Sequence, residues 1–68
     1  SLQHQCAIWI KHVRKKVGLT QVEMSKSLEI SQGTLSKLEK GYLEPRLTVL
    51  CKIRDLYGLN IFEKLELE

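Results

Sequence analysis

The sequence contains few of the residues that interrupt helices or cross-link a chain. Its 68 residues include one proline, four glycines and two cysteines. The low proline and glycine content argues against disorder, and the lack of β-branched alternation argues against a β-sheet. Cys6 and Cys51 are too few and too far apart for a disulfide framework. We therefore expect a helical protein in a reducing, cytoplasmic setting.

Long apolar segments are also absent. No run approaches the ~20 residues of a membrane-spanning helix, and no signal peptide precedes the first charged helix. We therefore expect no membrane partner. A chain of 68 residues forms one small domain and leaves little volume for an enclosed active site. The sequence thus predicts a single domain over residues 1–68 and no small-molecule ligand.

No group of side chains has the spacing of a catalytic or metal site. Cys6 and His12 differ by a rotation of about 240° on a helix, so they point to different faces. No Cys/His/Asp set matches a structural zinc site, and no nucleophile has a base within helical reach. We expect both thiols to be buried and inert, with no metal, no cofactor and no enzymatic activity.

Positive charge is concentrated in the first part of the chain. Residues 1–40 contain seven Lys or Arg against three Glu, whereas residues 41–68 contain four bases and five acids. The basic half is a candidate surface for a polyanion. A basic run on a small protein is usually a solvated face, so charge alone does not identify the partner.

Apolar residues recur at three- and four-residue spacing, which is typical of amphipathic helices. The expected core positions are Cys6, Trp9, Ile10, Val13 and Val17 in the first helix, and Leu47, Leu50, Cys51, Ile53 and Tyr57 in the fourth. We predict five helices at about Gln5–Val17, Gln21–Leu28, Ser31 to Gly41, Leu47–Tyr57, and a short fifth one capped by Asn60. Five short helices make an all-α fold.

The second and third helices have clear end signals. Thr20 and Glu23 form a capping box, and Ser31 is the N-cap of the third helix. Only residues 29–31 separate the two helices, so they cross steeply with Ile30 turned into the core. Glycines that follow a helical stretch adopt the left-handed conformation without strain. The predicted C-caps of this kind are Gly18, Gly41 and Gly58.

Four short motifs occur in order along GLTQVEMSKSLEISQGTLSKLEKGYLEP and the following LTVLCKIRDLYGLNIFEKL. They are LTQ, IS, L-x-x-x-E-x-G and P-x-L-x-x-L-x-x-I. From about Ile8 to Leu65 the chain resembles the lambda-repressor-like, Cro-type helix-turn-helix domains of the XRE family. The resemblance implies a compact five-helix domain with its helix-turn-helix at about residues 20–41. It also implies sequence-specific binding of double-stranded DNA by a transcription regulator, such as a phage-type repressor, a restriction-modification controller or an antitoxin.

Three positions depart from the pattern of this family. Ser25 stands where a small alanine is common, Glu29 where the turn usually has glycine, and Arg46 where relatives often place a capping serine. Serine is small enough to keep the close helix crossing. We expect Glu29 to hold a left-handed backbone angle, which is unfavourable for a residue with a Cβ.

The third helix carries the expected base-reading residues. If Leu35 and Leu38 face the core, the other side of this helix is polar and free of acids. A glutamine amide can pair with an adenine edge, and a lysine can donate to guanine. The family places its base-reading residues near the start of this helix, in the major groove. The resemblance therefore implies base contacts from Gln32, Gly33, Thr34, Ser36 and Lys37.

Phosphate contacts are expected on both sides of this helix, where they set position rather than sequence preference. The start of the second helix offers unpaired N–H groups to an anion. The expected phosphate-contacting residues are Gln21, Ser31, Lys40, Tyr42 and Arg46. Lys15 and Lys16 fit phosphate contact and plain solubility equally well, and Tyr42 fits a packing role equally well.

Two residues that look functional are better explained by structure. Glu39 is an acid beside the basic face, and the resemblance implies that it pairs with Arg14 of the first helix. Trp9 lies on the apolar stripe, so we expect a core residue rather than a stacking platform.

A single recognition helix reads too few base pairs to select one genomic site. Relatives bind as dimers to half-sites about 34 Å apart, so we expect a homodimer, formed on DNA or before it. The expected contact residues are Leu59, Ile61, Phe62 and Leu65. The alternative is a protein-interaction module that keeps the fold without binding DNA. The acid-free face of the third helix favours DNA.

Overall fold

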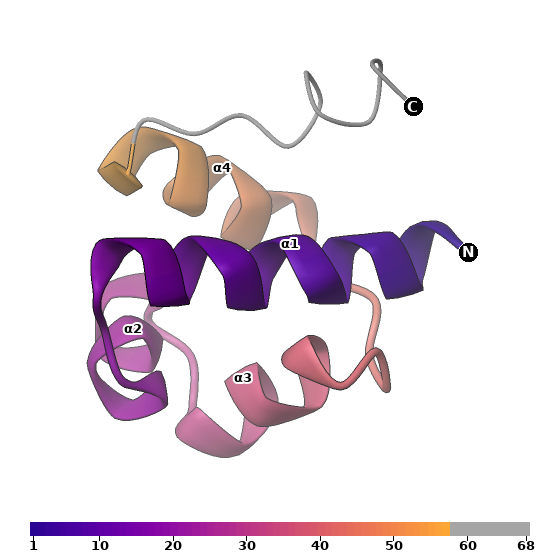
Figure 1. Ribbon diagram of the computed structural model, residues 1–68, viewed down its shortest axis with the longest axis horizontal. Coiled ribbons are helices and arrows are strands. Elements are labelled where there is room, and N and C mark those ends of the chain that lie inside the picture. The colour runs from indigo at the N-terminus through magenta and orange to yellow at the C-terminus, as the bar shows by residue number, and fades with distance from the viewer. Residues whose placement is uncertain (58–68) are drawn as a thin grey trace.

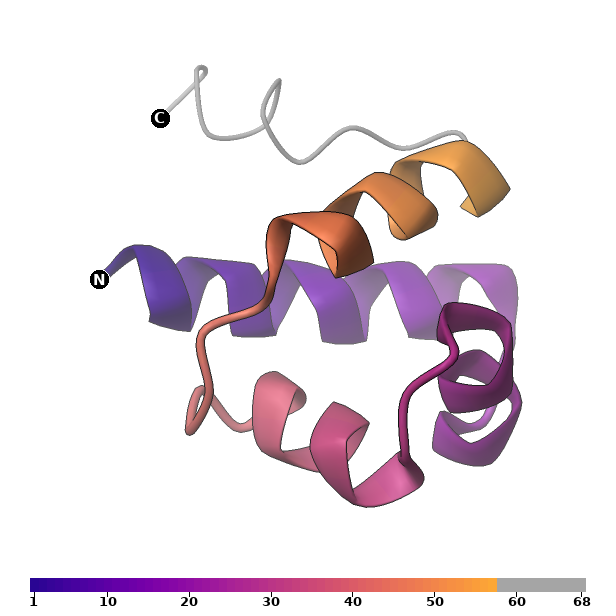
Figure 2. The same ribbon diagram turned by 180° about the vertical axis from the view of Figure 1, so that it is seen from behind.

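Four helices form the part of the chain that the structure describes, residues 1–57. In this computed structural model they are α1 (Leu2–Val17), α2 (Gln21–Leu28), α3 (Gln32–Glu39) and α4 (Leu47–Tyr57). Figures 1 and 2 show α4 on one side of α1 and the α2–α3 pair on the other. Helix α3 packs against α1 and α2, and α2 also contacts α4. The prediction of an all-α fold is confirmed for these residues.

The first helix begins earlier than the sequence suggested, at Leu2 rather than near Gln5. The Ser1 hydroxyl accepts a hydrogen bond from the His4 N–H at 3.2 Å and so caps the helix. The prediction was late because the apolar stripe starts only at Cys6. The extra turn gives α1 the length to run past the whole of α3 (Figure 1).

A residue with a left-handed backbone follows α1, α2 and α3, at the C-cap of α1 and α2 and one residue after the C-cap of α3. The φ angles are 79° at Gly18, 58° at Glu29 and 78° at Gly41. In each case the next N–H donates back into the last turn: Leu19 to Arg14, Ile30 to Ser25 and Tyr42 to Lys37, at 3.0–3.1 Å. The predicted cap at Gly18 and the left-handed angles of Glu29 and Gly41 are confirmed. The C-cap of α3 is Lys40, one residue before the predicted Gly41.

The predicted caps at the starts of α2 and α3 are present. Thr20 Oγ1 accepts from the Glu23 N–H at 3.1 Å, and Glu23 Oε1 accepts from the Thr20 N–H at 2.9 Å. The hydrogen bond from the Thr20 backbone is the main reason that the pKa of Glu23 lies below its usual value. Ser31 Oγ accepts from the Thr34 N–H at 3.0 Å and caps α3.

The core lies between α1, the α2–α3 pair and α4. Its buried residues are Cys6, Trp9, Ile10, Val13, Met24, Leu28, Leu35, Leu38, Val49, Leu50 and Ile53. Trp9 is only 5% exposed, which confirms it as a core residue. Ile30, in the turn between α2 and α3, packs against this core as predicted.

Three predicted core positions lie outside the core. Leu47 is 62% exposed and Val49 is buried in its place, because positions 49, 50, 53 and 57 share one face of α4 and position 47 does not. Val17 is 39% exposed because it is the last residue of α1. The half-buried Cys51 also differs from the expected buried thiol.

The close contact of α2 with its neighbours depends on a small side chain. Ser25 is 4% exposed, and its hydroxyl donates to the Val22 carbonyl at 2.8 Å. The polar atom is therefore satisfied within α2, and serine fills the place of the usual alanine, as expected.

The predicted fifth helix with its Asn60 cap lies outside the described residues. The same holds for Gly58 and for the expected dimer contacts Leu59, Ile61, Phe62 and Leu65. The structure thus supports four helices, and the fifth stays a prediction.

The left-handed residues Gly18 and Glu29 allow opposite tests of backbone strain. Nothing lies within 4 Å of a Cβ added at Gly18. Gly18→Ala should therefore lower the unfolding free energy only by the strain of a left-handed alanine, about 1 kcal/mol. Glu29→Gly should stabilise the domain, because the exposed ion pair with Lys52 that it removes contributes little. Urea unfolding measures both. Glu29→Ala is the control, and a Glu29→Gly variant less stable than it would contradict this account.

Candidate nucleic-acid interface

Helix α3 has a buried side and an exposed polar side. Leu35 is 0% exposed and Leu38 3%, and they fix the helix against the core. The residues on the other side carry amide, hydroxyl and ammonium groups and no carboxylate. They are the exposed Gln32, Gly33 and Lys37 and the half-buried Ser36. The structure therefore brings these four predicted base-reading residues onto one surface, named here the α3 face.

The fifth predicted base-reading residue, Thr34, lies at the edge of this face. It is half-buried, and its hydroxyl accepts a hydrogen bond from Ser31 Oγ at 2.8 Å. Together with Leu43 and Arg46 it lines a pocket between α3 and the segment before α4. Ser31 and Thr34 thus build the N-terminal cap of α3, with Ser31 remaining exposed.

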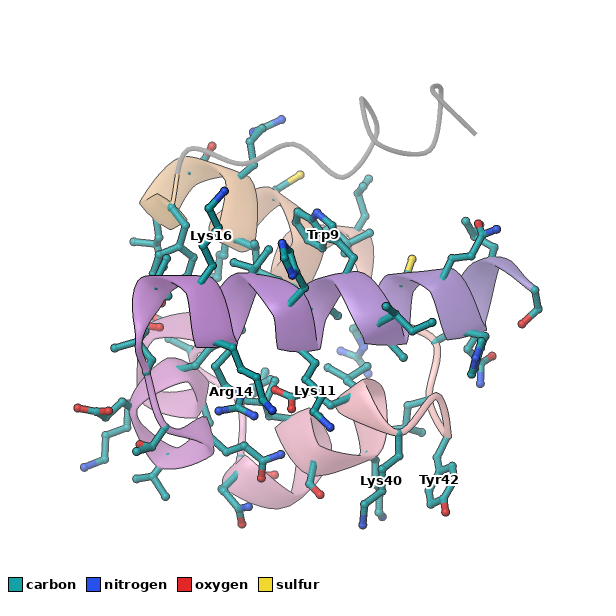
Figure 3. All side chains as sticks on the ribbon, in the orientation of Figure 1. Trp9, Lys11, Arg14, Lys16, Lys40 and Tyr42 are labelled. Atoms are coloured by element: carbon teal, nitrogen blue, oxygen red, sulfur yellow. The ribbon has the colours of Figure 1, made fainter. Side chains whose placement is uncertain are left out.

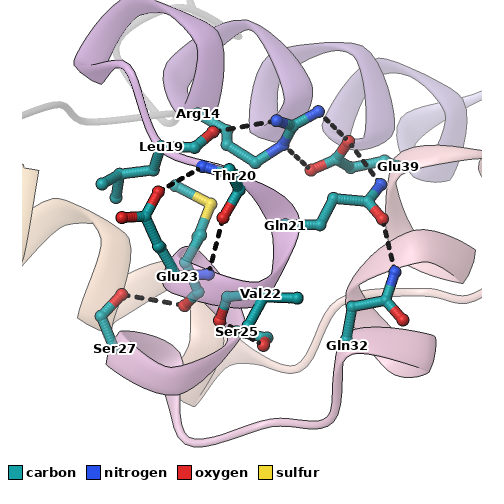
Figure 4. A network of polar contacts seen from close by, with 11 residues as sticks. Arg14, Leu19, Thr20, Gln21, Val22, Glu23, Ser25, Ser27, Gln32 and Glu39 are labelled. Carbon is teal, nitrogen blue, oxygen red and sulfur yellow. Dashed lines mark hydrogen bonds and ion pairs between the residues drawn. The ribbon is translucent and has the colours of Figure 1, made fainter.

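An ion pair between α1 and α3 supports the α3 face from behind (Figure 4). Arg14 Nε donates to Glu39 Oε2 at 2.7 Å and Nη2 donates to Oε1 at 3.0 Å, while Nη1 donates to the Leu19 carbonyl at 3.0 Å. The Arg14 side chain is 13% exposed and that of Glu39 3%. The hydrogen bond to Glu39 raises the pKa of Arg14 above its ordinary value. The pair implied by the resemblance is present, and Glu39 is a structural acid.

Two glutamines extend this ion pair to the surface. Gln21 Nε2 donates to Glu39 Oε1 at 3.2 Å, and Gln21 Oε1 accepts from Gln32 Nε2 at 2.8 Å. Since a carboxylate only accepts, Gln21 must turn its NH₂ group toward Glu39 and its oxygen toward Gln32. Figure 4 shows Gln32 Oε1 directed away from Gln21. The sequence indicated both glutamines but not that they bond to each other.

The remaining expected phosphate contacts lie beyond the end of α3. Lys40 Nζ lies 5.9 Å from the centroid of the Tyr42 ring, and Tyr42 is 70% exposed. That exposure disfavours a role for Tyr42 in packing alone. Arg46 is exposed, and its carbonyl accepts the first hydrogen bonds of α4, from Val49 and Leu50.

Sequence reasoning missed one residue that shapes this region. Gln3 Nε2 donates to the Gly41 carbonyl at 2.7 Å across 38 positions and ties the start of α1 to the turn that carries Tyr42. No sequence pattern could have revealed it, because a polar residue near a terminus gives no periodic signal.

Other kinds of site have little support within residues 1–57. No three His, Cys, Asp or Glu side chains lie close enough together there to hold a metal ion. None of the helices α1–α4 has the length and apolar character to cross a membrane. Burial, and secondarily the charge of Glu44, raises the pKa of the Cys6 thiol, which makes it a weaker nucleophile at neutral pH.

A comparison with known families matches residues 10–64 to the family described as Helix-turn-helix. The matched segment contains α2, the turn and the polar face of α3. This chain belongs to the XRE-type helix-turn-helix family. The predicted family is confirmed, and helix-turn-helix domains of this family are DNA-binding modules rather than enzymes.

Two relatives of this helix-turn-helix chain are named as regulators. The HTH-type transcriptional regulator ImmR of Bacillus subtilis is 35% identical over 51 residues, which are 75% of this chain and 40% of that regulator. An uncharacterized HTH-type transcriptional regulator of Methanocaldococcus jannaschii is 35% identical over 52 residues, 76% of this chain and 79% of that protein. The chain therefore spans less than half of the first relative. No solved structure gives a significant match.

The Arg14–Glu39 pair can be tested by a double-mutant cycle. Arg14→Met and Glu39→Met should each lower the unfolding free energy by roughly 2–4 kcal/mol, because each leaves a largely buried charge without its partner. The double variant should lose clearly less than the sum, since it leaves neither charge behind. Urea unfolding of the four proteins measures the coupling. Additive losses would mean that the two side chains do not interact in solution.

Proposed function

We propose that this chain binds double-stranded DNA sequence-specifically, with α3 in the major groove, as the DNA-binding domain of a transcription regulator. The family and the two regulators that it resembles support DNA as the partner. The observation that carries the proposal is the α3 face, which is exposed, polar and without a carboxylate. Duplex DNA presents one negative charge per ~1.7 Å of its axis, so an acid-free surface on a basic domain suits it.

Gln32 is the principal base-reading residue in this proposal. One N–H of its amide is bonded to Gln21, which leaves the second N–H and Oε1 for DNA. One donor and one acceptor side by side match N7 and the N6 amino group of adenine. Lys37 would donate to a guanine, and Ser36 can bond to either partner. Gly33 has no side chain, so the backbone of α3 can approach a base pair closely.

Phosphate contacts would frame these base contacts. Gln21 still has one amide N–H beyond its bond to Glu39 and lies at the start of α2, where backbone N–H groups favour an anion. The side chains beyond α3 would meet the backbone on the other side of the groove. The proposed phosphate-contacting residues are Gln21, Ser31, Lys40, Tyr42 and Arg46.

We further propose that the regulator acts in the cytoplasm as a homodimer. One copy of α3 reads only a few base pairs, which is not enough to select one site in a genome. Two copies on half-sites about 34 Å apart would double the number of base pairs that are read. The mass of the complex on a palindromic duplex, compared with a single half-site, distinguishes one bound copy from two.

The salt dependence of binding tests the proposed function directly. We expect log K for a random-sequence duplex to fall by about 0.9 per neutralised phosphate for each unit of log salt. Fluorescence anisotropy of a labelled duplex between about 50 and 200 mM salt measures this slope. If the chain does not bind, or if its affinity does not change with salt concentration, DNA is rejected as the partner and a protein-interaction module is favoured.

Substitutions on and beside the α3 face should separate base from phosphate contacts. Gln32→Ala and Lys37→Ala should each cost about 1–3 kcal/mol on the preferred duplex and relax its sequence preference. Arg46→Ala is the control and should weaken all sequences alike. Selection from a random duplex library with each variant measures the preference. If the preference of Gln32→Ala and Lys37→Ala equals that of the wild type, α3 does not read bases through these residues.

A further inference from the structure

We propose that the DNA-binding surface continues from α3 onto α1, where Lys11 contacts a backbone phosphate of the duplex. This inference rests on the proposed function, because its partner is the same DNA. It adds a contact from a helix outside the helix-turn-helix unit.

Hydrogen bonds and packing set the register of α1 against the end of α3. Near the start of α1, Gln3 donates to the Gly41 carbonyl at 2.7 Å, and a Cβ added at Gly41 would lie 3.8 Å from the Ala7 Cβ. Further along α1, Arg14 pairs with Glu39. The part of α1 between Ala7 and Arg14 therefore runs beside Glu39, the last residue of α3, and the two residues after it.

Lys11 lies on the side of α1 that faces α3. Positions 7, 11 and 14 follow a four- and three-residue spacing and share one face of the helix. In Figure 3 the side chains of Lys11 and Arg14 extend toward α3, whereas those of Trp9 and Lys16 extend toward α4. Unlike Arg14, Lys11 is exposed, so its ammonium group is accessible to an anion in solution.

No ion pair within residues 1–57 balances the lysines of α1. The helix contains no Asp or Glu, and Lys15 follows Lys11 at the spacing where like charges repel. Among the ion pairs formed within residues 1–57, none includes Lys11, Lys15 or Lys40. Glu39, the nearest acid by register, is already neutralised by Arg14. A bound phosphate would relieve the repulsion, whereas no protein carboxylate of the described part does.

The end of α3 carries a second ammonium group on the same side. Lys40 lies over the exposed ring of Tyr42, and Figure 3 shows both side chains extending from the α3 side of the molecule. Lys11 of α1 and Lys40, the C-cap of α3, therefore offer two positive charges beside the α3 face. Two positive charges beside the α3 face suit a polyanion such as a DNA strand.

Lys11→Gln and Lys16→Gln provide a matched test. Both remove one positive charge from an exposed position of α1, but on opposite sides of the helix. Lys11→Gln should reduce the slope of log K against log salt by about 0.9, because one phosphate contact is lost. If the affinities coincide at 1 M salt, this slope corresponds to about eightfold weaker binding at 0.1 M. Lys16→Gln should keep the slope of the wild type, and neither variant should unfold at a lower temperature than the wild type.

The outcomes distinguish this inference from the proposed function. A Lys11→Gln slope equal to that of the wild type, or the same loss in Lys16→Gln, would overturn the assignment of Lys11. A loss of affinity on the preferred duplex but not on a random-sequence duplex would also overturn it, because a phosphate contact does not depend on the base sequence. Absence of salt-dependent binding by the wild type would instead reject DNA binding itself.

Discussion

The ion pair between Arg14 and Glu39 is the contact on which the arrangement of α1, α2 and α3 depends. It joins α1 to α3 across 25 positions, and the same guanidinium holds the Leu19 carbonyl just before α2. Both charges are largely removed from water, so the pair roughly breaks even in net stability. A charge left alone there would cost several kcal/mol. The pair therefore acts mainly through geometry, because any displacement of α3 along α1 breaks its short hydrogen bonds.

The two short helices need this support. α2 and α3 have eight residues each, whereas isolated helices shorter than about 12–15 residues are marginal in water. α3 buries only Leu35 and Leu38, so its position depends on those two side chains, the cap at Ser31 and the pair at Glu39. Because these contacts are all on one side or at the ends, the opposite side can be entirely polar without loss of the core.

The features that sequence predicted well are local ones. The capping box at Thr20, the cap at Ser31 and the left-handed residues Gly18 and Gly41 involve positions a few residues apart. Contacts set by the register of one helix against another were not predictable in this way. Gln3 bonds to Gly41 from 38 positions away, and Leu47 is as apolar as its buried neighbours, so only the packed structure shows which residues of α4 face inward.

The α3 face is tied to the buried ion pair by a chain of hydrogen bonds. Each glutamine amide could point either way, since its oxygen and nitrogen ends are similar in shape. Glu39 accepts only, so it fixes Gln21, and Gln21 then fixes Gln32. In the proposed complex this order is established before DNA arrives, and less side-chain entropy is lost on binding. The acid buried behind α3 thereby determines which atoms of Gln32 meet a base, although it is itself too far inside to touch one.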